Sequence, residues 1–324
     1  MTVAVCICTL ARPAGLERCL QAIARAEIRS LAERVFILVV DNGPDARTES
    51  VCRNNGIPGL PELHYVAEPE RGISFARNRA LREALAREAD LVAFVDDDDV
   101  PEPDWLTELV TTQNETDAEI VYGRWVLPDG VQIPKLLEQV GFLRPKQFGS
   151  LNRYGVPRGA ATCNVLLARA LIERMAAEGP VFAPAFARCG GGDTEFFVRA
   201  HGKGTSHAIA DRSRVIRSWD PDRLTMRGVL RRSFRLGHSL TLVRRLHAHE
   251  KCRRLENSVR LATLLLTLPA YSWPPSRLVR RLVRIAWEVG AINAWLDRQC
   301  TYYGTDRPKH TGGRGLPTET LHSP

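Results

Sequence analysis

Apolar runs of strand length alternate with segments of helical character over the first 126 residues. The predicted strands cover residues 3–9, 35–40, 63–66, 91–95 and 120–126. The predicted helices lie between them, at residues 16–29, 74–87 and 105–113, with one more that follows the second strand and ends near residue 54. Strands that alternate with helices of this length favour a mostly parallel sheet with right-handed crossovers. The pattern therefore predicts an α/β fold.

The alternation weakens beyond residue 130, where helices dominate. Residues 132–159 are rich in Pro, Gly and aromatic side chains, and they are predicted to form loops with short helices. Further helices are predicted at 168–178, 193–202 and 227–249, followed by an apolar stripe within 278–296 that arginines flank. We therefore predict an α/β domain over 1–215, with halves at 1–125 and 126–215. A basic helical extension over 216–300 and a disordered tail over 301–324 complete the prediction.

Charge is unevenly distributed along the 324 residues. Residues 212–284 hold 18 Lys and Arg against 4 Asp and Glu, a net +14, whereas residues 1–211 hold 23 against 29, a net −6. Basic tracts suit nucleic acid, anionic lipid or diphosphate-bearing ligands. The basic segment has no helix-turn-helix, zinc or aromatic RNA-binding signature, so a nucleic-acid-binding protein is the weaker alternative.

The cysteines and the length of the apolar runs bear on the compartment. The eight cysteines form no C-x-x-C pair, which favours buried thiols in a reducing compartment over disulfides. No apolar run reaches the roughly 20 residues that a membrane-spanning helix requires. A cytoplasmic location is therefore predicted.

Four adjacent aspartates, Asp96–Asp99, follow the predicted strand at 91–95. Like charges this close raise each other's pKa values, so a positive partner is expected, and a divalent cation is the simplest one. The carboxyl ends of parallel strands are also where ligands bind in open α/β sheets. The alternative is an acidic helix start or a solvated turn, because Pro101 and Pro103 follow at once.

Other polar residues end the neighbouring predicted strands. Thr9 and Arg12 follow the first strand and Asp41 follows the second, so all three are expected at the crevice that holds the aspartates. Asp41 could accept a hydrogen bond from a nucleobase or ribose, and Arg12 or Arg77 could donate two to a phosphate. The alternatives are a turn at Asp41 and a solvated helix position at Arg77.

A further acidic residue follows a run of glycines. Gly190, Gly191 and Gly192 precede Asp193 at a predicted helix start. Glycines let the backbone approach a ligand closely, so Asp193 is a candidate functional carboxylate. Helix capping is the alternative, because aspartate is a common N-cap residue.

These motifs, taken together, resemble those of a known family. The matching segments are Val5-Cys6-Ile7-Cys8-Thr9 with Arg12, Val39-Val40-Asp41-Asn42, Arg71-Gly72 with Ala76-Arg77-Asn78, Phe94-Val95 with Asp96–Asp99, Pro101, Pro103 and Trp105, and 191–197. In number, order and spacing they resemble the inverting family 2 glycosyltransferases of GT-A fold, with most similarity to the bacterial exopolysaccharide (succinoglycan-type) glucosyltransferase branch. The resemblance implies a GT-A nucleotide-diphospho-sugar transferase fold with a Rossmann-like, mostly parallel sheet.

The resemblance also implies where a donor would bind. Thr9, Arg12 and Asp41 would hold the nucleoside of a sugar nucleotide, with Asp41 facing the base. Arg77 would lie near the nucleotide. A UDP-sugar is the expected donor.

The remaining roles concern the metal and the base. Asp96 and Asp98 match the D-x-D motif, in which the first residue faces the ribose and the metal and the second faces the metal that bridges the diphosphate. Four aspartates permit a shift of one position, so Asp97 is counted among the donor-binding residues. Asp193 matches the catalytic base. The residue that precedes this base is commonly glutamate in the family, and here it is Gly192.

The implied activity is a Mg²⁺- or Mn²⁺-dependent sugar transfer to an acceptor hydroxyl, with inversion, in bacterial surface polysaccharide or glycolipid assembly. A glycan or a polyprenyl-diphosphate-linked sugar is the expected acceptor. A lipid-linked acceptor would place the protein peripherally on the inner face of the cytoplasmic membrane, with the helix at 278–296 in the interface through Trp287 and Trp295. Core packing is the alternative for that helix. A catalytically silent sugar-nucleotide-binding relative is the alternative for the activity.

Overall fold

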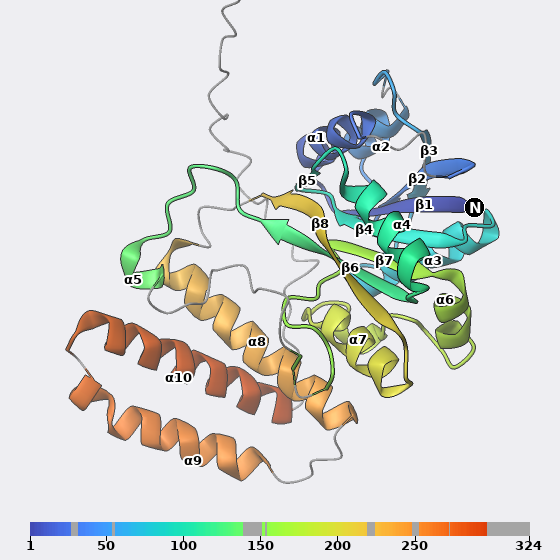
Figure 1. The fold of residues 1–324 in the computed structure, drawn as a ribbon. Coiled ribbons are helices and arrows are strands. Elements are labelled where there is room, and N and C mark those ends of the chain that lie inside the picture. The colour runs from blue at the N-terminus through green and yellow to red at the C-terminus, as the bar shows by residue number, and fades with distance from the viewer. Residues whose placement is uncertain are drawn as a thin grey trace, which may run out of the picture.

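The computed structural model describes residues 1–26, 32–53, 56–138, 151–152, 154–218, 224–247, 253–271 and 273–296. The tail predicted at 301–324, and much of the loop predicted at 132–159, lie outside the described residues. Figure 1 shows a central sheet with helices on both faces and a separate group of long helices at one end.

The sheet has eight strands in the order β3-β2-β1-β4-β7-β6-β8-β5. The strands are β1 (Thr2–Thr9), β2 (Arg34–Asp41), β3 (Glu62–Ala67), β4 (Leu91–Asp96), β5 (Asp99–Pro101), β6 (Ile120–Val126), β7 (Asn164–Ala168) and β8 (His207–Arg217). The first four are parallel to one another, β6 is parallel to β8, and β7 and β5 join their neighbours in antiparallel pairs. The predicted mostly parallel α/β sheet is therefore confirmed.

A hydrophobic core lies on each face of the sheet. On one face, α1 (Pro13–Ala24), α2 (Ala46–Arg53) and α4 (Trp105–Thr116) cover side chains of β1 and β2, and the fully buried Leu16 and Trp105 pack there. On the other face, α3 (Ile73–Ala86), α6 (Arg169–Ala176) and α7 (Gly192–Gly202) enclose an aromatic group that includes Phe182 and Phe196. The strands of the first half are apolar on both faces because helices cover both.

Three strands, β5, β7 and β8, were not predicted from the sequence. The β8 segment carries Asp211, Arg212 and Arg214, three exposed or partly exposed polar positions that hide its strand pattern. β8 also runs to Arg217, across the domain boundary predicted at 215. The first helix ends at Ala24, five residues before its predicted end at residue 29.

The remaining elements lie beyond the sheet. They are α5 (Lys135–Glu138), the 3-10 turns η1 (Pro184–Phe186) and η3 (Leu268–Tyr271), and three long helices, α8 (Met226–His247), α9 (Arg253–Leu266) and α10 (Pro275–Trp295). Figure 1 shows α10 between α8 and α9, with α9 farthest from the sheet. The predicted helical C-terminal region is thus confirmed. Within the ranges described, none of the helices combines the length and apolarity needed to cross a bilayer.

Two glycines allow α8 and α10 to pack backbone against backbone. A Cβ atom at Gly290 would lie 1.9 Å from the carbonyl oxygen of Phe234, and one at Gly237 would lie 2.1 Å from that of Trp287. The Ser233 hydroxyl donates a hydrogen bond of 2.6 Å to the carbonyl oxygen of Val283 at the same crossing. α10 is therefore the central helix of this group. This is the core-packing role that was the alternative to a position in the membrane interface.

We expect Gly290→Ala to destabilise the protein by roughly 1–3 kcal/mol, because the added methyl group forces the two backbones apart. Gly202→Ala is the matched control, since nothing lies within 4 Å of a Cβ built at this end of α7. That change should alter the free energy of unfolding by less than about 1 kcal/mol. Urea unfolding of both variants measures the difference, and equal stabilities would contradict the close crossing.

Candidate active site

The carboxyl ends of β1, β2 and β4 bring three predicted site residues to one edge of the sheet. Thr9 is the register partner of Asp41, and Cys8 is the partner of Asp96. This is the edge at which open α/β sheets bind ligands. The structure therefore gathers Thr9, Asp41 and the aspartate turn, although they are up to 90 positions apart in the chain.

Asp97 and Asp98 turn toward the start of α1. The Thr9 hydroxyl donates a hydrogen bond of 2.7 Å to Asp97 Oδ2, and Arg12 Nη1 lies 2.9 Å from Asp97 Oδ1 and 2.7 Å from Asp98 Oδ2. Burial raises the pKa of Asp97 to about 6, against the opposing charge of Arg12. α1 comes this close because Gly15 has no side chain, and a Cβ there would lie 3.1 Å from the Asp97 carbonyl oxygen.

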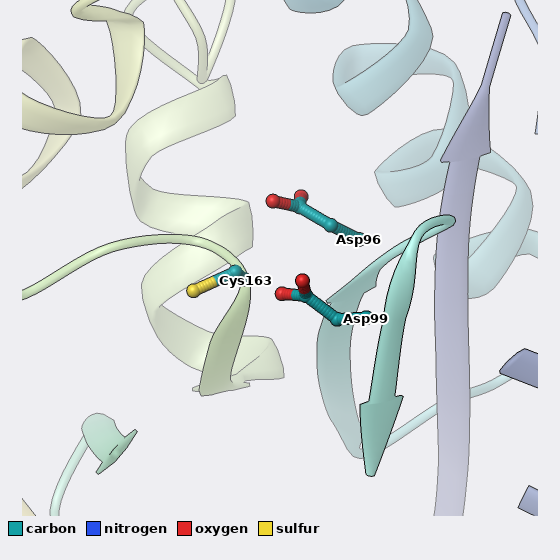
Figure 2. A group of neighbouring side chains, drawn as sticks. All are labelled: Asp96, Asp99 and Cys163. Carbon is teal, nitrogen blue, oxygen red and sulfur yellow. The ribbon is translucent and has the colours of Figure 1, made fainter. Parts of the chain in front are cut away.

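Asp96 and Asp99 form a second group on the other side of the turn. Their carboxylates and the thiol of Cys163 each offer an atom within 4.8 Å of the others, and Figure 2 shows both carboxylates directed to the side on which Cys163 lies. Arg217 supplies the counter-charge, with Nη2 3.2 Å from Asp96 Oδ2 and Nε 3.6 Å from Asp99 Oδ2. The Arg217 guanidinium also lies 5.0 Å from the ring centre of Trp125.

The donor set of this second group fits a hard divalent cation. Asp99 is 1% exposed, and neither of its carboxylate oxygens has a hydrogen bond of ordinary geometry within the described part of the chain. Burial raises its pKa, which the Arg217 charge and the nearby backbone N–H of Ser218 oppose. Burial raises the pKa of the Cys163 thiol well above its usual range, so the sulfur stays protonated and is a poor ligand for Mg²⁺ or Mn²⁺. The oxygens of Asp96 and Asp99 are therefore the groups that could hold such an ion, which would stabilise negative charge on a diphosphate.

Asp193 reaches the same region from α7. Its Oδ1 accepts a hydrogen bond of 2.7 Å from the backbone N–H of Thr194. The N-cap position of α7 belongs to Gly191, at φ 89°, and no side chain caps the helix. Asp193 is therefore not the N-cap residue, and its carboxylate accepts one backbone N–H of the first turn. Besides burial, the negative charges of Asp99, Asp96 and Asp193 raise the pKa of the Cys163 thiol, so all three carboxylates are near enough for their charge to act on it.

Gly192 leaves little space for the glutamate that the family usually has there. A Cβ at this buried position would lie 3.3 Å from Phe186 Cβ and 3.4 Å from the hydroxyl of Ser74. The site is therefore built around a glycine, with α3 and η1 filling the space beside it.

Asp41 and Arg77 lie farther from the aspartate turn. Asp41 is fully buried and accepts hydrogen bonds from the backbone N–H groups of Gly43 and Asp45 and from the hydroxyl of Tyr65. Burial raises its pKa, and these three hydrogen bonds oppose the shift. Arg77 on α3 is partly buried, with its guanidinium 5.4 Å from the ring centre of Phe182. The turn predicted as the alternative at Asp41 is thus present, and its carboxylate still borders the edge of β2.

Three residues of the site, Arg217, Cys163 and Asp99, were not assigned these roles from the sequence. Arg217 ends β8 and Cys163 directly precedes β7, and neither strand was predicted, so no motif pointed to these two residues. Asp99 belongs to the aspartate run, but the D-x-D spacing drew attention to Asp96 and Asp98. A polar residue at the end of β8 would have been the signal for Arg217, had the strand been recognised.

The fold and the candidate site define an α/β protein in which carboxylates from distant segments lie at the carboxyl edge of the sheet. The family described as "Glycosyl transferase family 2" matches residues 4–176. Because this match covers more than half of the chain, the protein belongs to that family, as the motifs predicted.

Two curated relatives are similar in sequence. The succinoglycan biosynthesis protein ExoM of Rhizobium meliloti (strain 1021) is 30% identical over 245 residues, which cover 74% of this chain and 75% of the relative. The glucosyl-dolichyl phosphate glucuronosyltransferase of Haloferax volcanii is 32% identical over 99 residues, which cover 31% of this chain and 30% of the relative. The similarity to the succinoglycan branch is therefore confirmed, and it extends beyond the first half of the sheet.

Solved structures share the fold. The mannosyltransferase PcManGT from Pyrobaculum calidifontis, solved with GDP-Man and Mn²⁺, superimposes with a TM-score of 0.60 at 19% identity, covering 92% of this chain and 88% of that one. Residues 1–349 of S. aureus TarS give a TM-score of 0.52 at 13% identity, with 92% of each chain covered. In the longer TarS chain the match covers 55% of that protein. At these identities the likeness confirms the predicted glycosyltransferase fold.

Proposed function

We propose that this protein transfers a sugar from a nucleoside-diphosphate donor to an acceptor hydroxyl, with inversion at the anomeric carbon. The observation that carries the proposal is the group formed by Asp96, Asp99 and the Cys163 thiol, with Asp193 near enough for its charge to act on the same thiol. One carboxylate pair can hold a cation against the donor diphosphate, and a separate carboxylate remains for the acceptor. The family and the GDP-Man and Mn²⁺ bound to PcManGT support this assignment.

The donor would lie along the edge formed by β1, β2 and β4. In this proposal Thr9 and Asp41 border the nucleoside, and Arg12 and Arg77 provide positive charge near the phosphates. A UDP-sugar remains the expected donor, supported by the UDP complex of TarS.

A divalent cation, Mg²⁺ or Mn²⁺, would be held by Asp96 together with Asp98 or Asp99. The contacts favour Asp99, because Asp98 Oδ2 already accepts a short hydrogen bond from Arg12. Asp97 likewise accepts hydrogen bonds from Thr9 and Arg12, and in this proposal it positions the turn beside the donor.

In the proposed reaction the two acidic groups have different roles. The acceptor oxygen bonds to the anomeric carbon on the face opposite the diphosphate, and the bond from that carbon to the diphosphate oxygen breaks. Asp193 takes the proton of the acceptor hydroxyl as general base. The electron pair of the broken bond leaves with the nucleoside diphosphate. A single displacement of this kind inverts the anomeric centre.

The acceptor and the location belong to the same proposal. A glycan or a polyprenyl-diphosphate-linked sugar is the proposed acceptor, because similar proteins are a succinoglycan biosynthesis protein and a glucosyl-dolichyl phosphate glucuronosyltransferase. We place the protein in the cytoplasm, peripherally on the inner face of the cytoplasmic membrane, where such lipid-linked acceptors would be accessible.

A donor panel tests the proposal. UDP-, GDP- and dTDP-sugars are incubated with the protein, Mn²⁺ and a membrane lipid extract, and the released nucleoside diphosphate is measured. Release that requires lipid and stops on addition of EDTA is expected for a UDP-sugar. Donor binding without release from any combination would instead identify a catalytically silent relative.

Arg217→Gln tests whether the Arg217 guanidinium occupies the place of the cation. Without Arg217 the buried carboxylate of Asp99 loses its counter-charge, so the metal-free protein should lose about 3 kcal/mol of stability. Mn²⁺ should then bind about tenfold more tightly and restore much of that stability, because no internal cation competes. Arg212→Gln is the control on the same strand, since its side chain is 77% exposed and pairs with Glu108. Thermal unfolding with and without Mn²⁺, and Mn²⁺ titration by electron paramagnetic resonance, measure both effects; unchanged Mn²⁺ affinity would contradict the competition.

A further inference from the structure

α9 uses only one of its faces to pack against the protein. Of the side chains described on this helix, at 255–266, only Asn257 and Leu264 are buried, and Leu261 is partly buried. These positions follow one another at intervals of four and three, so they share one face of the helix. Asn257 Nδ2 donates a hydrogen bond of 2.5 Å to Glu288 of α10, which attaches that face to its neighbour.

The opposite face of α9 is also apolar, and it faces solvent. Leu255, Val259, Ala262 and Leu266 recur at intervals of four, three and four, half a turn away from the packed face. Leu255 is 74% exposed, Val259 56% and Leu266 82%. A surface helix normally places polar residues on its outer face, so a second apolar stripe requires another partner.

The exposed apolar surface continues beyond the end of α9. Leu265 is 50% exposed and Trp273, in the segment that leads into α10, is 78% exposed. We call Leu255, Val259, Ala262, Leu265, Leu266 and Trp273 the outer face. All of these residues except Trp273 lie on α9, the helix of this group that is farthest from the sheet (Figure 1).

Exposed arginines lie on α10, the helix next to α9. Arg277, Arg280 and Arg284 are exposed along the neighbouring α10 and recur at intervals of three and four. Arg284 and Trp287 of α10 line a groove of about 460 Å³ together with Val259 and Leu264 of α9. Residues 253–296 contain seven arginines and two acidic residues, Glu256 and Glu288. Apolar side chains are thus combined with a clear excess of positive charge.

We propose that the outer face of α9 is a docking surface for an anionic lipid bilayer, with α9 lying in the plane of the membrane. Amphipathic helices of this kind insert their apolar side chains at the headgroup boundary, while flanking arginines attract anionic lipids. A second copy of the chain fits less well, because its arginines would face the same arginines. This surface differs from the interface expected from the sequence, because α10 packs on α8 and the Arg245 guanidinium lies 5.1 Å from the ring centre of Trp295.

Vesicle flotation of the full chain without any sugar nucleotide tests the surface independently of the proposed activity. The protein should float with vesicles in which about a third of the phosphatidylcholine is replaced by phosphatidylglycerol, and only weakly with phosphatidylcholine alone. Leu266→Asp should lower binding about tenfold or more, because an aspartate replaces an inserted leucine. Arg277→Gln with Arg280→Gln should lower it by at least about fivefold, and added salt should have the same effect.

Leu151→Asp is the matched control, because Leu151 is 53% exposed but lies in the segment before β7. Its vesicle binding should equal that of the unchanged protein. Thermal unfolding should be similar for all variants, since each replaced side chain is exposed. The proposal is overturned if Leu266→Asp floats like the unchanged protein. It is also overturned if the protein binds no vesicles and forms a dimer that Leu266→Asp dissociates, as sedimentation velocity would show.

Discussion

Asp193→Asn is expected to abolish sugar transfer and to leave donor binding unchanged. Asparagine has the shape of aspartate but cannot take the acceptor proton, and loss of a general base typically lowers the rate by about 10²–10⁴-fold. The Asp193 carboxylate is partly exposed at the start of α7, and the hydrogen bond it accepts from the Thr194 N–H can pass to the amide oxygen. The variant should therefore fold normally, so the loss would be a loss of chemistry.

Single-turnover release of nucleoside diphosphate gives the rate, and isothermal titration with the donor and Mn²⁺ gives the affinity. Asp211→Asn is the matched control, since this side chain is 66% exposed and pairs with Arg124 on the outside of the sheet. It should retain full activity. Turnover of Asp193→Asn at the unchanged rate would show that another group accepts the proton.

The first half of the fold was predictable because its strands are short, apolar and separated by helices. β1, β2, β3, β4 and β6 all lie within one or two residues of their predicted positions. Parallel strands also place their carboxyl ends together, so the meeting of Thr9, Asp41 and Asp96 follows from the order of elements alone. Local pattern and overall topology agree here, which is the condition under which sequence is informative.

The rest of the site depends on packing between distant segments. β8 is recognisable only once β6 and β5 pair with it, because its own sequence is interrupted by charged residues, and it carries Arg217 to the aspartates. The two apolar stripes of α9 likewise become distinguishable only when α10 covers one of them. Adjacent aspartates offer no pattern by themselves. A sharp turn between β4 and β5 decides which of them faces Arg12 and which faces Cys163.

Asp98 faces Arg12 whereas Asp99 faces Cys163, so substitutions at these two neighbouring positions should affect Mn²⁺ binding very differently. Asp99→Asn should weaken Mn²⁺ binding by about 100-fold and remove metal-dependent donor binding, because changes in the shell around a ligand already cost about 10–100-fold. The amide is nearly the same size as the carboxylate, but it gives up the ion pair with Arg217, so the metal-free stability is measured alongside. Asp98→Asn is the matched variant, one position away. It should keep the Mn²⁺ affinity within a few-fold, since Asp98 faces Arg12.

Mn²⁺ titration by electron paramagnetic resonance compares the two variants directly, with thermal unfolding as the check on folding. Asp96→Asn should behave like Asp99→Asn, because the two carboxylates lie together beside Cys163. The resemblance to family 2 enzymes places the second metal ligand at Asp98, whereas the contacts place it at Asp99. Normal Mn²⁺ binding by Asp99→Asn together with its loss in Asp98→Asn would assign the D-x-D spacing of Asp96 and Asp98. The turn would then have to rotate away from Arg12 when metal and donor bind.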